Sequence, residues 1–174
     1  MSEARSLLSP NFNSRPDYAE VSLLVIHNIS LPPGQFGGAY ICDFFTNKLD
    51  VSCHPYFEEI AGLEVSAHLL IDRQGGITQF VSFDNRAWHA GLSCYEGIDD
   101  CNNYSIGIEL EGTDETPYTN RQYAVLADVT KALIGHYPAI TKQRIVGHNE
   151  IAPGRKTDPG AAFDWLRLFA ALGA

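Results

Sequence analysis

The feature of this sequence that most constrains its fold is a short apolar run that ends at a histidine. Leu23, Leu24, Val25 and Ile26 are followed directly by His27. A continuous apolar run indicates a strand that is covered on both faces, whereas strict alternation would indicate one solvated face. Such strands lie in the middle of sheets that are flanked by helices. The run therefore predicts an α/β fold in which His27 lies at or near the end of a central strand.

The remaining elements are predicted from apolar spacing and from turn and cap residues. At 119–122, Thr119 and Gln122 form a capping box that starts a helix. The final helix has apolar residues all round, so we expect it to pack into the body of the domain. These elements predict one α/β domain over residues 1–174, with a mixed sheet flanked by helices after an irregular arm at 1–20. The expected ranges are a helix at 39–47, strands at 66–72 and 77–83 joined by a turn at 73–76, a strand at 105–111, a helix from 119 to about 135–138, a strand at 144–147 and a helix at 161–172.

Charge and hydropathy exclude several classes of partner. The formal net charge is −9 and there is no basic run, so binding to nucleic acid or to an anionic membrane is not expected. No apolar stretch approaches the roughly 20 residues of a membrane-spanning helix. Because no signal-peptide core is present, we expect a cytoplasmic protein with reduced thiols. We also expect a monomer. Cys94 and Cys101 flank a loop with a glycine and are the one pair to test for a bridge.

The histidines suggest a metal site of an uncommon kind. The sequence has no HExxH helix motif and no GxSxG motif, which excludes the common zinc-protease helix and the serine-hydrolase elbow. A catalytic zinc ion takes three protein ligands, and His27, His148 and Asp158 would supply two imidazoles and a carboxylate. The alternative is that both histidines bind backbone carbonyls and that Asp158 caps the final helix.

Two further charged residues could act beside such a site. Lys156 precedes Asp158 by two residues, and side chains at this spacing share a face in an extended segment; the alternative is a surface lysine. Glu109 lies on the small-residue face of the strand at 105–111, where it could act as a general base. Glu111 shares that face, and a solvated strand face is the alternative for both carboxylates.

Long ordered motifs that contain these residues resemble one known family. From about residue 8 to the C-terminus, the chain is similar to the type-2 N-acetylmuramoyl-L-alanine amidases, whose fold is shared with the peptidoglycan-recognition proteins. Within the family the similarity is greatest to the cytoplasmic type that acts on 1,6-anhydro-N-acetylmuramyl peptides. The motifs are LLVIHNISLPPGQFGG (23–38), SAHLLI (66–71), RAWHAG (86–91), NNYSIGIELEGTD (102–114) and VGHNEIAPGRKTDPG (146–160).

The resemblance implies a set of roles for the site residues. It implies Zn²⁺ as the cofactor, Glu109 as the residue that acts on the attacking water and Lys156 as the positive group beside the metal. It leaves Glu111 in a supporting role. The implied zinc ligands are His27, His148 and Asp158.

The resemblance also implies a muropeptide as the partner. Asn28, Trp88 and His89 match positions around the family's substrate groove, although Trp88 could instead be a core residue. The carboxylates of a muropeptide favour nearby arginines, for which Arg86 and Arg155 are candidates.

The expected reaction is zinc-dependent hydrolysis of the amide between the lactyl group of (1,6-anhydro)-N-acetylmuramic acid and L-alanine. The resemblance places it in cell-wall recycling, where it also keeps the inducer of β-lactamase low. One alternative is a secreted or phage-type amidase that lyses the wall. Another is a non-catalytic peptidoglycan receptor, a class that loses a metal ligand on this fold, whereas all three are present here.

Overall fold

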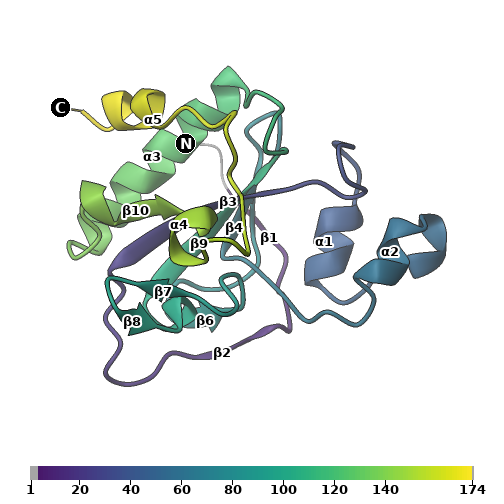
Figure 1. The fold of residues 1–174 in the computed structure, drawn as a ribbon, viewed down its shortest axis with the longest axis horizontal. Coiled ribbons are helices and arrows are strands. Elements are labelled where there is room, and N and C mark those ends of the chain that lie inside the picture. Colours follow the sequence, from purple (N-terminus) through teal and green to yellow (C-terminus); the bar gives the residue numbers. More distant parts are fainter. Residues whose placement is uncertain (1–3, 174) are drawn as a thin grey trace.

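A six-stranded mixed sheet forms the centre of the computed structural model, which describes residues 4–173 (Figure 1). The strand order is β1-β5-β4-β9-β3-β10. The strands β4, β9, β3 and β10 are mutually parallel, and β5 runs antiparallel to β4. The mixed sheet that the sequence predicts is therefore confirmed. The bounds are β1 Arg5–Ser6, β3 Leu23–Ile29, β4 Leu69–Ile71, β5 Ile77–Gln79, β9 Ser105–Glu111 and β10 Ile145–Gly147.

The N-terminal arm is more regular than the sequence indicates. The prediction of an irregular arm at 1–20 is wrong at two short strands, because β1 pairs with β5 and β2 (Phe12–Ser14) pairs with β6 (Asn85–Ala87), whereas the rest of residues 4–20 forms no helix or strand. Residues 1–3 of the predicted arm lie outside the described residues. The hairpin of β4 and β5 is present, with shorter strands than predicted. A second small hairpin joins β7 (Cys94–Tyr95) to β8 (Ile98–Asp99).

The central strands bury both of their faces. On one face, Leu24 and Ile26 of β3 pack with Ile108 of β9 and with Leu126 of α3 (Asn120–His136). On the other face, Leu23 and Val25 enter a second apolar cluster. His27 follows Val25 by two residues and lies on this second face, because side chains alternate along a strand. The apolar run therefore fixes the side of the sheet on which His27 lies.

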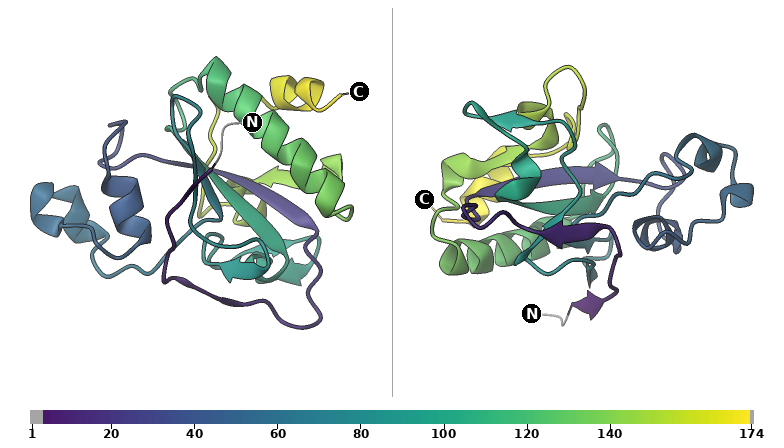
Figure 2. Two further views of the ribbon diagram at one scale, coloured as in Figure 1. Left: turned by 180° about the vertical axis from the view of Figure 1, so that it is seen from behind. Right: turned by 90° about the horizontal axis from the view of Figure 1, so that it is seen from below.

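Two helices of the C-terminal half lie on the first face of the sheet (Figure 2). The capping box of Thr119 and Gln122 starts α3 as predicted. The last helix, α5 (Trp165–Ala171), begins later than expected, where the Asp164 side chain accepts a hydrogen bond from the backbone of Arg167. The expectation that this helix packs into the body is confirmed for one side only: Leu168 is buried in the cluster on the first face, whereas Leu166 is 83% exposed.

A small helical lobe, defined here as residues 40–63, stands to one side of the sheet past the end of β3 (Figure 1). It contains α1 (Tyr40–Phe45), a 3-10 turn (Val51–Cys53) and α2 (Tyr56–Glu59). Its aromatic residues pack with Leu70 and Phe80 in a third apolar cluster. The lobe is thus joined to the sheet by apolar contacts.

Two remaining expectations concern cysteines and membranes. All four cysteines lie in the described part of the chain, and each is a free thiol there. None of the helices within residues 4–173 is both long and apolar enough to cross a membrane.

The remaining short elements lie next to β9 and β10. Short 3-10 turns at Cys101–Asn103 and Lys142–Arg144 precede these two strands, and α4 (His148–Ile151) follows β10 directly.

Candidate active site

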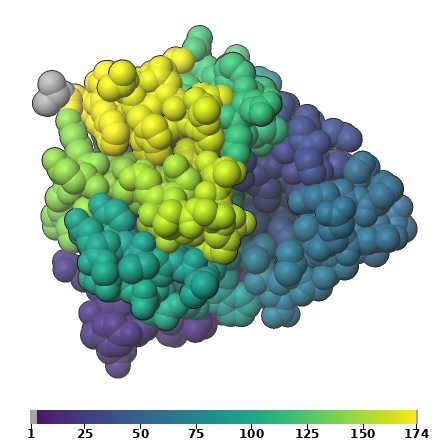
Figure 3. All heavy atoms as spheres, in the orientation of Figure 1, coloured from purple at the N-terminus to yellow at the C-terminus, as the bar shows by residue number. Residues whose placement is uncertain are grey.

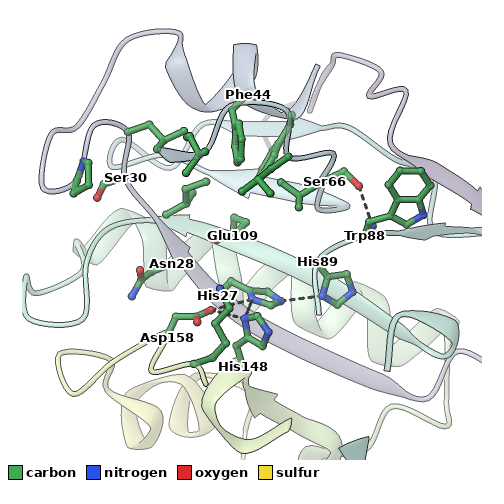
Figure 4. Close-up of a pocket in the computed structure, with 18 of the residues that line it drawn as sticks. His27, Asn28, Ser30, Phe44, Ser66, Trp88, His89, Glu109, His148 and Asp158 are labelled. Carbon is green, nitrogen blue, oxygen red and sulfur yellow. Dashed lines mark hydrogen bonds and ion pairs between the residues drawn. The ribbon is translucent and has the colours of Figure 1, made fainter. Parts of the chain in front are cut away.

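Three side chains that are distant in the sequence meet at the ends of two neighbouring parallel strands (Figure 4). His27 lies near the end of β3. His148 is the first residue after β10, whose Gly147 pairs with Ile26 of β3. Parallel pairing therefore brings the two imidazoles to the same edge of the sheet. Asp158 arrives from the loop after α4, and its backbone oxygen accepts a hydrogen bond from the Asn149 amide.

The ligand atoms form a nearly equilateral triangle. Nδ1 of His27 lies 3.0 Å from Nδ1 of His148, and the two nitrogens lie 3.0 and 3.1 Å from Oδ2 of Asp158. Two imidazole nitrogens and a carboxylate oxygen repel one another at this separation unless a proton or a cation lies between them. Ligands of a tetrahedral zinc ion are separated by about 3.3 Å, given metal–ligand bonds of roughly 2.0–2.2 Å. The three residues therefore fit a zinc ion.

The protonation of these side chains also suits a metal. Burial lowers the pKa of His27 to about 4, so its imidazole is neutral near neutral pH. Burial opposes ionisation of Asp158, but hydrogen bonds from His148 and His27 hold the pKa of its carboxyl group well below its usual range. Nε2 of His148 donates to the Ala90 carbonyl oxygen, at 3.0 Å, which leaves Nδ1 for the triangle. Two imidazole nitrogens and one carboxylate oxygen are a common donor set for zinc.

Glu109 is a buried carboxyl group above this triangle. It pairs with His27 in the register of β3 and β9 and is 9% exposed. Its Oε2 atom is buried and has no hydrogen-bond partner among the described residues. Burial, with a contribution from Asp158 that Lys156 opposes, raises the pKa of Glu109 well above its usual range. An unpaired buried carboxyl group is costly to keep, and such groups are concentrated at functional sites.

Glu111 lies on the same face of β9 but has a different environment. Its two oxygens accept hydrogen bonds from the backbone amides of Gly37 and Arg73, at 2.5 and 3.0 Å. These bonds connect the loop after β3 to the turn after β4, which is a structural role. Both carboxylates are buried, so a solvated strand face is wrong for Glu109 and Glu111 alike.

A cavity of about 380 Å³ opens over the triangle and has two unlike walls. We call the first the polar wall; its members are His27, Glu109, His148, Lys156 and Asp158. The second wall is the helical lobe, which contributes apolar side chains. Figure 3 shows the opening as a hollow between the yellow-green loop at 148–160 and the blue lobe. The lobe residues that line it are Phe44, Phe45, Tyr56, Ile60 and Leu63.

Three of the predicted substrate contacts line this cavity. Asn28 donates through Nδ2 to Oδ1 of Asp114, at 2.8 Å. The Trp88 ring is half-buried at one end of the cavity, and Nε1 donates to Oδ1 of Asn13 at 2.9 Å. Because the Trp88 ring is half-buried and lines the cavity, a position in the core is wrong for this residue. His89 lines the cavity as well, but its Nδ1 lies 2.9 Å from Nε2 of His27.

The two predicted arginines lie outside this cavity. Arg155 lines an adjoining surface pocket that also includes Asn28 and Lys156. Arg86 lies on β6, where its guanidinium donates to the side chains of Asn103 and Asn13. The structure thus brings together the residues of the polar wall with Asn28, Trp88 and His89, while it directs Arg86 elsewhere.

Sequence reasoning missed the apolar wall and the groups behind the histidines. The segment from Cys42 to Leu63 has weak periodicity, so its short helices give no clear amphipathic signal. The carbonyl oxygen of Ala90 has no side-chain signature at all. The contact of His89 with His27 has only a weak signal in the sequence, which is the large number of histidines in a chain of this length.

Comparison with known proteins gives one consistent result. A family model described as N-acetylmuramoyl-L-alanine amidase matches residues 17–161. The 1,6-anhydro-N-acetylmuramyl-L-alanine amidase AmpD of Escherichia coli is 59% identical over 165 residues, which cover 95% of this chain and 90% of the relative. The protein of that name from Haemophilus influenzae is 54% identical over 172 residues, or 99% and 94% of the two chains.

Solved structures agree with these relatives. The crystal structure of a selenomethionine AmpD derivative superposes with a TM-score of 0.95 at 57% identity, covering 99% of this chain and 96% of that chain. A more distant structure is the Escherichia coli amidase AmiD in complex with its substrate anhydro-N-acetylmuramic acid-L-Ala-D-γ-Glu-L-Lys. It has a TM-score of 0.63 at 28% identity and covers 90% of this chain and 60% of that chain.

Proposed function

Because this chain belongs to the N-acetylmuramoyl-L-alanine amidase family, we propose that it is a zinc-dependent hydrolase of soluble muropeptides. The bond cleaved is the amide between the lactyl group of (1,6-anhydro)-N-acetylmuramic acid and L-alanine. The observation that carries the proposal is the convergence of His27, His148 and Asp158 beneath the unpaired carboxyl group of Glu109 in one cavity. Relatives that match more than nine-tenths of this chain are named for this activity.

The residues of the polar wall divide the reaction between them. A zinc ion held by the three ligands would supply Lewis-acid chemistry, which polarises an amide carbonyl and acidifies water. Glu109 accepts a proton from the water that attacks the carbonyl carbon. As the C–N bond breaks, Glu109 passes this proton to the nitrogen of the departing L-alanine.

Lys156, Asn28, Trp88 and the helical lobe act on the substrate. The Lys156 ammonium lines the cavity and offers positive charge to the oxyanion that forms on the carbonyl oxygen. Trp88 and the helical lobe provide apolar surface for a sugar ring or peptide methyl groups. Asn28 offers a carboxamide, and the position of Arg155 in the adjoining pocket supports a contact between its guanidinium and a peptide carboxylate. Arg86 has no part in this proposal, because its guanidinium is bonded to asparagines away from the cavity.

The relatives that are named for 1,6-anhydro substrates support a biological setting for this activity. We propose that the protein works as a monomer in the cytoplasm on fragments recovered from the cell wall. Removal of these fragments would also keep the inducer of β-lactamase low. A wall-lytic amidase would have to act on intact sacculi. Turnover of sacculi can therefore be compared directly with turnover of soluble anhydromuropeptide.

The test is mass spectrometry of the products from a defined anhydromuramyl tripeptide. We expect release of anhydro-N-acetylmuramic acid and of the intact peptide with a free L-alanine amine. Treatment with a chelator should stop the reaction, and added zinc should restore it. Products cut at another bond, or unchanged turnover after removal of the metal, would contradict the proposal. Rapid lysis of sacculi would replace the recycling role by the lytic one.

A further inference from the structure

Two consecutive residues contact the far side of both metal-binding histidines. Nδ1 of His89 lies 2.9 Å from Nε2 of His27 (Figure 4). The carbonyl oxygen of Ala90 lies 3.0 Å from Nε2 of His148. In each imidazole the other nitrogen, Nδ1, belongs to the ligand triangle. The dipeptide His89-Ala90 therefore occupies the one remaining hydrogen-bonding position of each histidine.

The backbone of this dipeptide is itself held in place. Oδ1 of the buried Asn102 accepts hydrogen bonds from the amides of both His89 and Ala90, at 3.1 and 2.8 Å. On the other side, Nη2 of Arg155 donates to the Ala90 carbonyl oxygen at 2.7 Å. The two residues are thus fixed by groups that do not themselves belong to the ligand triangle.

The ring of His89 is fixed as well. Its Nε2 lies 3.1 Å from Oγ of Ser105, which is fully buried at the start of β9. The ring lies over Gly107, where an added Cβ would be 2.4 Å from Cγ of His89. A side chain at position 107 would therefore displace the ring. The strand that carries Glu109 also provides the space in which His89 sits.

These contacts settle which nitrogen carries each proton when a metal is bound. A carbonyl oxygen only accepts hydrogen bonds, so Nε2 of His148 carries a proton and donates it to Ala90. When Nδ1 of His27 faces a metal, Nε2 of His27 carries the proton and His89 accepts it through Nδ1. His89 then carries its own proton on Nε2, where the Ser105 hydroxyl oxygen accepts it.

We propose that His89 is a positioning residue, which holds His27 with Nδ1 toward the metal and thereby sets the affinity of the site. The Ala90 carbonyl oxygen holds His148 in the same way. Asn102 keeps His89 and Ala90 in place through its hydrogen bonds to their backbone amides. This inference rests on the proposed function, since it deepens the account of its metal site. It gives His89 a different role from the substrate contact that the sequence predicts. Partners that fix the tautomer and orientation of a metal ligand affect affinity about 10- to 100-fold.

The first measurement is zinc affinity by competition with a chromogenic chelator. We compare the unsubstituted protein with His89→Ala, His89→Asn and, as a matched control, His136→Ala, which removes an exposed histidine of α3. His89→Ala should bind zinc about 10- to 100-fold more weakly, and His136→Ala should bind as the unsubstituted protein does. His89→Asn should recover part of the loss, because Oδ1 of asparagine can take the place of Nδ1 as acceptor.

A spectroscopic readout separates positioning from simple loss of packing. With Co²⁺ in place of zinc, the visible absorption bands report the geometry around the ion. We expect these bands to change in His89→Ala and to return toward the original form in His89→Asn. If His89 instead contacts substrate, His89→Ala will raise KM while zinc affinity and the Co²⁺ bands stay unchanged. That result would overturn the inference.

A second variant covers the case in which His89→Ala does not fold. Ser105→Ala removes the hydroxyl group behind His89 and leaves every ligand and His89 itself in place. We expect a loss of zinc affinity of roughly threefold to tenfold, smaller than for a direct partner. Unchanged affinity in this variant would overturn the inference. Failure of the unsubstituted protein to bind zinc would overturn the proposed function, whereas binding that is indifferent to His89 and Ser105 would overturn this inference alone.

Discussion

The two walls of the cavity are built in different ways. The polar wall comes from the ends of parallel strands and from the loop after α4, and the side chains of His27, His148 and Asp158 in it are joined by hydrogen bonds with defined partners. The helical lobe consists of short helices and a 3-10 turn, and it contributes apolar side chains to the cavity. Strand register fixes atoms to within fractions of an ångström, as a metal requires. Apolar surface tolerates larger displacements, so substitutions should affect chemistry on one wall and substrate affinity on the other.

The largest effect should follow removal of a proposed metal ligand. His148→Ala takes away one corner of the triangle, so we expect bound zinc and turnover to be lost together. Zinc per chain by atomic emission and turnover of an anhydromuropeptide measure the two losses. His136→Ala, with its exposed ring, is the control. Full zinc occupancy in His148→Ala would show that the ion binds elsewhere. The polar wall would then not be the metal site, and its contrast with the helical lobe would fail.

A large effect of a second kind is expected at Glu109. Glu109→Gln keeps the shape of the side chain but cannot take a proton from water, so kcat should fall about 10²- to 10⁴-fold. Zinc content should stay the same, because Glu109 is not part of the triangle. Steady-state kinetics and metal analysis of one preparation test this. The control is Glu20→Gln, at an exposed carboxylate. A near-normal kcat in Glu109→Gln would exclude Glu109 as the general base.

A smaller effect should follow truncation in the helical lobe. Leu63 lines the cavity and is 51% exposed, so Leu63→Ala should fold normally. Loss of apolar contact worth about 1 kcal/mol should raise KM about threefold to tenfold with little change in kcat. Leu166→Ala, which truncates an exposed leucine of α5, is the matched control. A fall in kcat with unchanged KM would mean that the two walls do not divide the work as described.

The smallest effect concerns the stability of metal-free protein. The pKa of Glu109 is raised in the folded state, so the folded chain holds this proton more tightly than the unfolded chain does. Its contribution to stability therefore decreases as pH rises above the ordinary glutamate pKa and toward the folded value. Glu109→Gln removes this dependence. In metal-free protein, the free energy of unfolding of Glu109→Gln minus that of the unsubstituted protein should therefore be larger at pH 8 than at pH 4. Urea unfolding at both pH values measures this difference, and the same difference at both would argue against a raised pKa of Glu109.

Strong local signals in the sequence predicted the parts of the fold that they specify directly. The apolar run before His27 predicted the central strand, and Thr119 with Gln122 predicted the start of α3. Strands β1 and β2 could not be predicted, because they are two and three residues long and exposed, and each is held by a partner more than 70 residues away. The apolar residues of the last segment predicted a helix at 161–172, but they could not show that it begins only at Trp165 or that Leu166 stays exposed.

The site was predictable in its members but not in its geometry. Residue types and resemblance selected His27, His148 and Asp158, yet only the pairing of β3 with β10 explains why two of them adjoin. Pattern could not separate Glu109 from Glu111, because the two share a strand face. Their hydrogen bonds separate them, since Glu111 has backbone partners on both oxygens and Glu109 has a free one.

The most direct test of the central claim is a crystal structure of the zinc-loaded protein with anomalous data at the zinc edge. The account predicts one strong peak at the triangle, with Nδ1 of His27, Nδ1 of His148 and one carboxylate oxygen of Asp158 each about 2.0–2.2 Å away. A peak at other residues, or no peak at the triangle in crystals of active protein, would contradict it.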